Sequence, residues 1–361
     1  MNIQYHLRCG LIFLVVFCVF GCASAVKPVA WESPPNPGYT GQFEPNEQLK
    51  AIEQFPIGDN EGPEAVAIDA EGRIYASTHK GIIVRLDKDC KNPENWADTG
   101  GRPLGISFDN DGNLIVADAF RGLLSITPDG TVAELATVAD GIPIRYANDV
   151  DVADNGCIYF SDSSTKFGAK ENGGTLEACI LDMMEHGGHG RLLRYNPKTQ
   201  KVDTLMKGIN YANGVAVSHD QQYVLVNETS TYSVIRYWIA GEKINQSEYL
   251  LEQLPSFPDN ITTGSDGVFW IALVSPRSKL MDGLSEHTLM RKMAAGLPKF
   301  LRPTPKDYGH IIGINGDGEV VYNMQDPEGN FPMITGVCET PDYLYLGSLI
   351  SPNIGRLKWS D

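Results

Sequence analysis

Hydrophobic and polar residues alternate along most of this chain, and one such pattern is repeated six times. In each copy about five positions alternate, a turn of the Asp-x-Gly type or a substitute follows, and a second alternating run completes the pair. Alternation with a period of two predicts β-strands, and a turn in which glycine or asparagine takes positive φ joins them as a hairpin. The first five copies start at residues 64, 104, 148, 213 and 259, and a weaker sixth follows Ile334.

Further strand pairs are expected between the copies, in 81–88, 122–137, 190–206, 233–251 and 310–324. Two hairpins per unit make a four-stranded sheet, and six such sheets packed radially make a β-propeller. A β-sandwich is the alternative all-β fold, but it does not explain a pattern that recurs six times. The sequence therefore predicts an all-β, six-bladed β-propeller with four-stranded blades over residues 46–361. A strand within 47–57 is expected to pair with the last blade and close the ring.

One position in each copy is expected to face the central channel, because the first strand of each blade runs beside it. These positions hold Glu64, Leu104, Asn148, Asn213, Asp259 and, less regularly, Thr335. Four of the six side chains carry oxygens suited to a metal, and two of those four are carboxylates. Such a set, with no soft ligand, is typical of a hard divalent cation, and calcium accepts it better than magnesium. Asn and Asp are also common turn residues at strand entries, but four at equivalent positions, one of them a glutamate, favour a metal site.

Two insertions are expected to form partly helical segments on the rim. The first, 163–190, predicts a short amphipathic helix that is either a lid over the pocket or a surface helix with no role. Its apolar positions are Leu176, Cys179, Ile180, Met183 and Met184. The second, 277–305, has a loosely helical apolar pattern with basic residues. It is expected to pack on the propeller, and contact with a membrane surface is the alternative.

The composition indicates which class of binding partner to expect. The chain has 361 residues, is 42% hydrophobic and carries a net charge of −16. No basic run is present, so a nucleic-acid partner is not expected, because phosphate binding needs clustered Lys and Arg. A small-molecule substrate is expected instead.

The first 25 residues have the features of an export signal. Arg8 precedes an apolar run, 11–20, that is too short to span a bilayer comfortably. Val19 to Cys22 resembles a lipoprotein signal, which favours a lipid-anchored protein on the periplasmic side of a membrane. Cleavage after Ala25 would instead release a secreted protein. Residues 26–45, rich in Pro and Gly, are predicted to form a tether.

Four cysteines, Cys90, Cys157, Cys179 and Cys338, lie beyond the signal. In an exported domain they could form two disulfides, whose pairing the spacing does not determine, or remain as free buried thiols.

No nucleophile elbow, phosphate-binding loop or HExxH motif is present. Hydrolytic chemistry would therefore depend on the channel metal, which polarises a carbonyl or phosphoryl oxygen. Asp259 is the best candidate base or nucleophile, because it combines proximity to the metal with a second carboxylate oxygen. His186 and His189 are weaker catalytic candidates, since histidines flanked by glycines in a loop are usually solvent-exposed.

Several stretches together resemble the strictosidine synthase-like branch of the superfamily that contains gluconolactonases, paraoxonases and squid-type phosphotriesterases. They are GRPLGISFD, ADAFRGL, YANDVDV, YFSDSS, GRLLRY, ANGVAVS and FPDNITT, and they look most like the animal adipocyte plasma membrane-associated proteins. The resemblance covers residues 45–358. It implies a six-bladed propeller with one catalytic calcium ion, and metal-dependent hydrolysis of aryl esters, lactones or organophosphates. The ligands that it implies are Glu64, Asn148, Asn213 and Asp259, with Asn260 beside them.

Three departures from the superfamily's patterns limit what the resemblance implies. Leu104 stands where paraoxonases have a histidine, so their histidine-dyad mechanism is not expected. Ala65 replaces an acid that helps to hold a second calcium ion. Residues 330–337 lack the glutamate with which plant strictosidine synthases condense their substrates, and Glu339 is the nearest acid. The leading hypothesis is an exported calcium-dependent hydrolase of esters or lactones. A non-catalytic, calcium-stabilised binding propeller is the main alternative, and a condensing enzyme is disfavoured.

Overall fold

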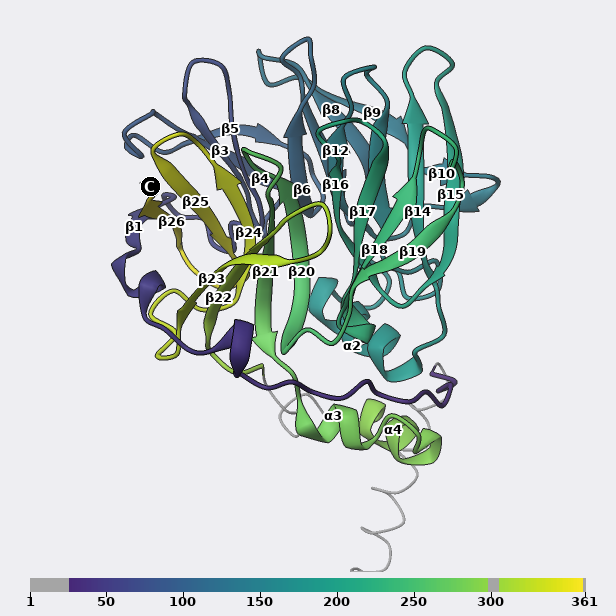
Figure 1. Cartoon of the computed structure of the whole chain (residues 1–361). Helices are drawn as coiled ribbons and strands as arrows, with labels where there is room; N and C mark the ends of the chain where they lie inside the picture. The colour runs from purple at the N-terminus through teal and green to yellow at the C-terminus, as the bar shows by residue number, and fades with distance from the viewer. Residues whose placement is uncertain (1–25, 298–304, 360–361) are drawn as a thin grey trace, which may run out of the picture.

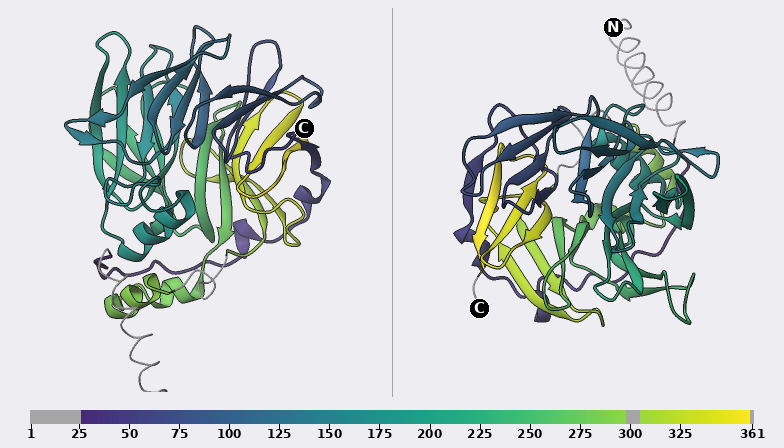
Figure 2. Two further views of the ribbon diagram at one scale, coloured as in Figure 1. Left: turned by 180° about the vertical axis from the view of Figure 1, so that it is seen from behind. Right: turned by 90° about the horizontal axis from the view of Figure 1, so that it is seen from above.

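The chain forms six four-stranded antiparallel sheets arranged around a central axis, as the sequence predicts (Figures 1 and 2). The computed structural model describes residues 26–297 and 305–359. The predicted export signal, 1–25, lies outside the described residues. The hairpins form where alternating apolar residues flank turns such as those at Gly72, Gly112 and Gly156, each with positive φ.

Successive blades take successive strands, with the first strand of each innermost. Their strands are β2 (Val66–Ile68), β3 (Ile74–Ser77), β4 (Ile82–Leu86) and β5 (Glu94–Asp98); β6 (Pro103–Phe108), β7 (Leu114–Asp118), β8 (Gly122–Ile126) and β9 (Val132–Ala136); β12 (Ala147–Val152), β13 (Ile158–Asp162), β14 (Gly190–Asn196) and β15 (Lys201–Ile209); β16 (Ala212–Val217), β17 (Tyr223–Glu228), β18 (Ser233–Trp238) and β19 (Ser247–Leu251); β20 (Ser256–Thr263), β21 (Phe269–Pro276), β22 (Gly309–Ile314) and β23 (Val320–Asp326); and β24 (Ile334–Glu339), β25 (Tyr343–Ser348), β26 (Asn353–Lys358) and β1 (Glu53–Pro56). A small extra hairpin pairs β10 (Val138–Ala139) with β11 (Ile142–Pro143).

The sixth blade joins the two ends of the chain. Strand β1 pairs antiparallel with β26, with Glu53 opposite Arg356 and Phe55 opposite Ile354. The expected closing strand is therefore present. Apolar side chains of neighbouring blades meet between the sheets, as where Ile115 and Leu123 of one blade pack with Val150 and Phe160 of the next. Burial of these layers stabilises the ring by roughly 25 cal/mol per Å² of apolar surface.

The innermost strands of blades two to six are irregular at the predicted channel-facing position. Strand register shifts there, which marks a β-bulge that turns the side chains of the strand out of their ordinary alternation. The affected pairs are 104–105, 148–149, 213–214, 259–260 and the residue at 335. The backbones of adjacent blades approach closely at these bulges. A Cβ on Gly214 would lie 2.3 Å from the Ile261 nitrogen, so only glycine fits there.

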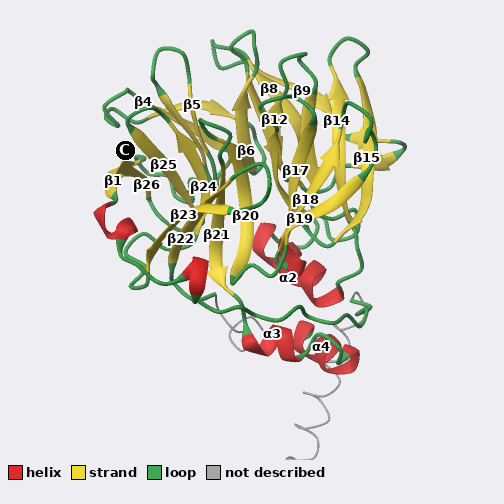
Figure 3. Cartoon of the chain, viewed as in Figure 1, coloured by secondary structure: helices red, strands yellow, loops and turns green. Residues whose placement is uncertain are grey.

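The helices gather at one end of the propeller (Figures 1 and 3). The α-helices at this end are α2 (Thr175–Glu185), α3 (Lys279–Gly283) and α4 (Thr288–Ala295). Short 3₁₀ turns are η1 (Gly41–Phe43), η2 (Gln48–Ala51), which lies beside β23 and β26, and η3 (Thr229–Thr231). Both insertions thus form the partly helical rim segments that the sequence predicts. Among the described residues, no helix is long and apolar enough to cross a membrane.

Candidate metal and substrate site

Four of the predicted ligands line one cavity at the helical end of the channel. Glu64 precedes β2, Asn148 lies on β12, Asn213 on β16 and Asp259 on β20. Each is at most 7% exposed, and together with Leu104 they form the floor of a cavity of about 440 Å³. The bulges of β12, β16 and β20, together with the segment that enters β2, therefore bring residues up to 195 positions apart to a single place (64 to 259).

The two asparagines are held so that their side-chain oxygens lack a partner. Asn148 donates from Nδ2 to the Ser163 hydroxyl at 2.9 Å, and that hydroxyl donates to the Ala212 carbonyl at 2.7 Å. Asn213 repeats the arrangement with Thr229 at 3.2 Å, which donates to the Pro258 carbonyl. Neither Oδ1 atom accepts a hydrogen bond from any described residue. A buried, unpaired oxygen is costly, so two of them at one site indicate a missing electropositive partner.

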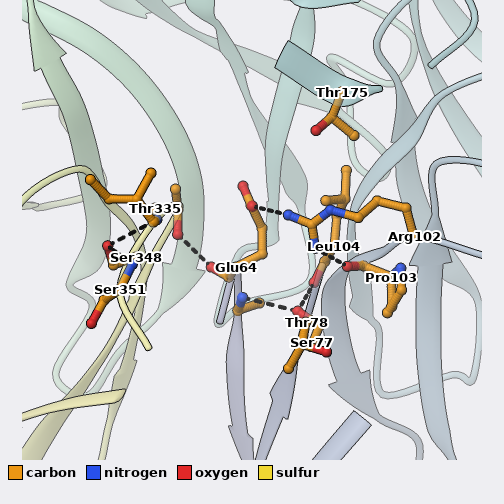
Figure 4. A network of polar contacts seen from close by, with 12 residues as sticks. Glu64, Ser77, Thr78, Arg102, Pro103, Leu104, Thr175, Thr335, Ser348 and Ser351 are labelled. Atoms are coloured by element: carbon orange, nitrogen blue, oxygen red, sulfur yellow. Dashed lines mark hydrogen bonds and ion pairs between the residues drawn. The ribbon is translucent and has the colours of Figure 1, made fainter. Parts of the chain in front are cut away.

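Arg102 lies beside this floor and pairs with Glu64 (Figure 4). Its Nη2 donates to Glu64 Oε2 at 2.8 Å and its Nη1 to the Pro103 carbonyl at 2.9 Å, and both charged groups are buried. The pairing occupies one oxygen of the Glu64 carboxylate. Arg102, whose role the repeat did not predict, reduces the net negative charge of the ring.

The two carboxyl groups are strongly perturbed. Burial raises the pKa of Glu64, and the nearby Arg102 opposes this shift. Burial also raises the pKa of Asp259 well above its usual range, and the charge of Glu64 raises it further. Two acids that interact in a dry site favour either a shared proton or a bound cation.

These residues fit a calcium ion through their oxygens. The described residues contain no cluster of three or more His, Cys, Asp or Glu side chains that could hold a metal. The ring has only two acids, and its remaining oxygens come from amides, which calcium accepts. Glu64, Asn148, Asn213 and Asp259 could therefore hold the ion, at a site whose charge Arg102 reduces.

Asn260, the remaining implied ligand, and Thr335, the remaining channel position, do not line the cavity. Asn260 is buried, and neither polar atom of its side chain has a partner among the described residues. Thr335 donates from Oγ1 to the Glu64 carbonyl at 2.7 Å, so its hydroxyl supports the backbone of the first blade. Asp149, which follows Asn148, accepts from the Val215 nitrogen, and burial raises its pKa to about 8.

A second ring of residues lies two positions before the floor residues. They are Arg102, Tyr146, Tyr211, Phe257 and Met333, and all but Arg102 line the same cavity. These positions could have been identified from the repeat, because residues two apart on a strand share a face. The Tyr211 hydroxyl donates to that of Tyr146 at 2.6 Å, which donates to the Thr175 carbonyl at 2.9 Å. This chain of bonds fixes the start of α2 over the channel.

Helix α2 covers the cavity, as the lid hypothesis expects. Leu176, Cys179, Ile180, Met183 and Met184, the apolar positions predicted for it, all line the cavity wall. A second hollow of about 550 Å³ adjoins the start of α2 and shares Thr175, Leu176 and Met333 with the first. The cavity wall above the floor is mainly apolar.

Residues 26–43 run across the helical end and are called here the N-terminal strap (Figure 1). The Val29 nitrogen donates to the Glu185 carbonyl at 2.8 Å, and Trp31 stacks on His186 at 4.1 Å between ring centroids. Arg277 donates to the Pro34 carbonyl at 2.6 Å. The segment predicted as a tether is thus bound to α2 and to the second insertion.

The other candidates lie away from the floor. His186 packs against the strap, His189 bonds Glu185 Oε1 at 2.8 Å, and neither lines the cavity. Glu339 accepts from Trp270 Nε1 at 2.5 Å and is likewise outside the cavity. The four cysteines beyond the signal are free, so the disulfide alternative is wrong.

The fold places the chain among the six-bladed propellers, and solved gluconolactonase structures resemble it. A gluconolactonase from Xanthomonas campestris superposes with a TM-score of 0.63 at 15% identity, over 92% of this chain and 98% of that one. The calcium-binding protein regucalcin from Agrobacterium tumefaciens gives 0.58 at 13% identity, over 85% and 93%. At these identities the similarity establishes the fold alone.

Sequence similarity identifies the family. The strictosidine synthase model matches residues 148–242, and the strictosidine synthase-like N-terminal model matches 41–86. Protein strictosidine synthase-like 7 of Arabidopsis thaliana is 35% identical over 86% of this chain and 83% of its own length. The adipocyte plasma membrane-associated protein of Rattus norvegicus is 29% identical over 93% of each. The chain belongs to the strictosidine synthase-like family, which confirms the resemblance.

Proposed function

We propose that the chain is a calcium-dependent hydrolase of esters or lactones, with its reaction centre at the cavity floor. The observation that carries the proposal is the pair of buried, unpartnered amide oxygens, Asn148 Oδ1 and Asn213 Oδ1, beside two interacting carboxyl groups. Calcium bound there would supply positive charge to polarise a substrate carbonyl.

The residues around the floor have separable roles. Asp259 is the proton acceptor for the attacking water, or the nucleophile, because it is the channel carboxylate that no arginine pairs. Arg102 orients Glu64 and opposes the rise in its pKa that burial causes. Tyr146, Tyr211 and Phe257 form the wall nearest the floor, and the methionines of α2 exclude water from above. A mainly apolar wall suits an aryl or alkyl ester better than a sugar lactone.

The test is hydrolysis of an aryl acetate and of an alkyl-substituted lactone by the purified chain, with calcium and with EDTA. We expect turnover in calcium, and a loss of at least 100-fold, on the order of one general base, in EDTA and in Asp259→Asn. Asp111→Asn is the control, because it makes the same change of acid to amide at an exposed residue that does not line the cavity. It should retain activity.

Calcium binding is measured in parallel, by calorimetry and by the shift in melting temperature. Stoichiometric binding without turnover of either substrate would replace the hydrolase with a non-catalytic binding propeller. Absence of calcium binding would refute the metal site.

A further inference from the structure

The strap, the start of α2 and the second insertion together present an unusual apolar surface, which we name the helical face. Its members are Val29, Leu176, Leu280, Leu289, Met290 and Met293, of which Leu176 and Leu280 are partly exposed residues that also line the cavity. These six are half of the twelve large hydrophobic residues that are exposed among the described parts of the chain. Of the other six, Val138 and Ile142 share the β10–β11 hairpin, Ile350 lines the second hollow with Leu176, and Ile244, Tyr249 and Val321 lie apart. The helical face is the largest of these groups, so its presence at this end requires an explanation.

Helix α4 is oriented with its apolar side outward. Leu289, Met290 and Met293 are 47 to 65% exposed, whereas Arg291 is 2% exposed. Arg291 is held inside by its bonds to the Val29 carbonyl at 2.7 Å and the Met183 carbonyl at 2.8 Å. A helix whose only role was to cover the propeller would bury its leucine and methionines and expose its arginine. The orientation of α4 therefore indicates an apolar environment on its outer side.

The amino end of the chain enters the fold at this same face. Val26 is buried, and it packs in one cluster with Met184 of α2 and Ala295 of α4. The apolar run 11–20 ends six residues before it (Phe20 to Val26), a distance that an extended chain spans with at most about 20 Å. Any membrane attachment through that run, or through a lipid on Cys22, brings the helical face within that reach of the bilayer.

The charges around the face are compatible with a lipid surface. Lys27 and Lys279 are exposed and Lys292 is partly exposed, while the acids Glu32 and Glu286 lie beside them. The face is therefore close to neutral on a chain of net charge −16. Lysines at the edge of an apolar patch can reach lipid phosphates while the apolar side chains enter the acyl region.

We propose that the helical face docks on the surface of a lipid bilayer, with Leu289, Met290 and Met293 of α4 inserted among the acyl chains. The proposal does not depend on whether the cavity is catalytic. It places α2 and the opening beside it next to the membrane, so that apolar ligands can reach the cavity from the lipid.

The test adds one tryptophan to the five that the chain already has. It uses lipids whose acyl chains carry bromine, which quenches indole emission on contact. The full chain, as Met290→Trp or as Ile244→Trp, is reconstituted in vesicles of phosphatidylcholine with a minority of phosphatidylglycerol. Ile244 is the matched control. Its side chain is similarly exposed, 51% against 55% for Met290. It lies in the turn that follows β18, whereas Tyr232, which contacts Trp31 of the strap, lies just before the start of that strand.

After subtraction of the parent chain's emission, we expect the added tryptophan of Met290→Trp to be quenched at least twofold and that of Ile244→Trp to be unaffected. Adding Leu289→Ser and Met293→Ser to the first variant should reduce the quenching. An unquenched Met290→Trp on a chain that floats with the vesicles would show that the amino end alone attaches it, and would overturn the proposal. Equal quenching of both tryptophans would overturn it as well.

Discussion

At the residue scale, the two acids of the cavity floor differ, because one is paired with a cationic side chain and the other is not. Glu64 has a guanidinium at 2.8 Å, while Asp259 has no cationic partner among the described side chains. A buried ion pair gains little net stability, but loss of one partner leaves an uncompensated charge. Replacement of Arg102 should therefore lower the stability of the ring and raise its affinity for a cation.

We predict that Arg102→Met lowers the free energy of unfolding by about 3–5 kcal/mol in EDTA, because Glu64 is left buried without its partner. Calcium should restore more stability to the variant than to the parent chain, since a positive charge beside the site has been removed. Thermal melting with and without calcium measures both effects. Arg194→Met, which breaks the half-exposed pair with Asp203, is the control and should change little. An equal calcium response in the variant and the parent would contradict a cation at Glu64.

The floor could be predicted from the sequence because its residues occupy one register of a repeat. The same register predicts the bulged positions of Asn148, Asn213 and Asp259. The ion pair of Arg102 was not predicted, although it lies two positions before Leu104. Whether Arg102 pairs with Glu64 depends on how far these side chains of adjacent blades reach into the channel. The alternation of apolar and polar residues does not specify that reach. The hydroxyls that orient the asparagines belong to Ser163 and Thr229, which directly follow the second strands of their blades and lie outside the repeated position.

At the element scale, α2 carries a buried acid that the candidate reaction does not use. Asp182 Oδ2 accepts from the Ser164 hydroxyl at 2.6 Å, and its Oδ1 has no partner among the described residues. Burial raises the pKa of Asp182 to about 7. The folded chain therefore binds a proton at this position more tightly than the unfolded chain does. The associated stability is complete below about pH 4 and is lost as the pH rises to about 7.

We predict that Asp182→Asn removes this slope, because an amide does not ionise. Stability of the parent should fall by up to about 1.4 kcal/mol per pH unit between about pH 4 and 7 relative to the variant. Above about pH 7, the stability of Asp182→Asn relative to the parent chain should be higher than it is at pH 4. Urea unfolding across this range measures the difference. The exposed Asp111→Asn serves as the control and should follow the parent chain.

The helices show what the spacing of apolar residues can predict and what it cannot. Apolar spacing predicted α2 and its inward residues, because one clear stripe must face the propeller. In α4 the same kind of spacing does not reveal which side is buried, and the buried side contains Arg291. The strap was not predicted to pack, since its irregular backbone has no period and its partners lie more than 150 residues away.

At the scale of the whole molecule, the ring is held closed by a seam between β1 and β26. Phe55 of β1 lies under the guanidinium of Arg356 at 4.6 Å and packs against the cluster that contains Ile354. The seam also includes the exposed pair between Glu53 and Arg356 at 2.6 Å. Apolar contact and strand pairing, rather than the exposed ion pair, should supply most of its stability.

We predict that Phe55→Asp destabilises the whole propeller by about 2–4 kcal/mol, because it removes an apolar contact and adds a charge at the seam. The loss should lower a single melting transition for all blades, since each blade packs on two neighbours. Phe55→Leu, which retains apolar bulk, should lose less than half as much. A separate early transition that involves the sixth blade alone would contradict closure as a global constraint.

The seam also has a consequence for biosynthesis. The strand that completes the sixth blade, β1, comes from the start of the folded region, and its partner β26 is the last strand along the described chain. A ribosome must therefore release the chain through β26 before the ring can close, and the other five blades emerge without that constraint. An export apparatus that threads unfolded chains would encounter this polypeptide while it still lacks its final constraint. Closure of the ring would then take place on the far side of the membrane.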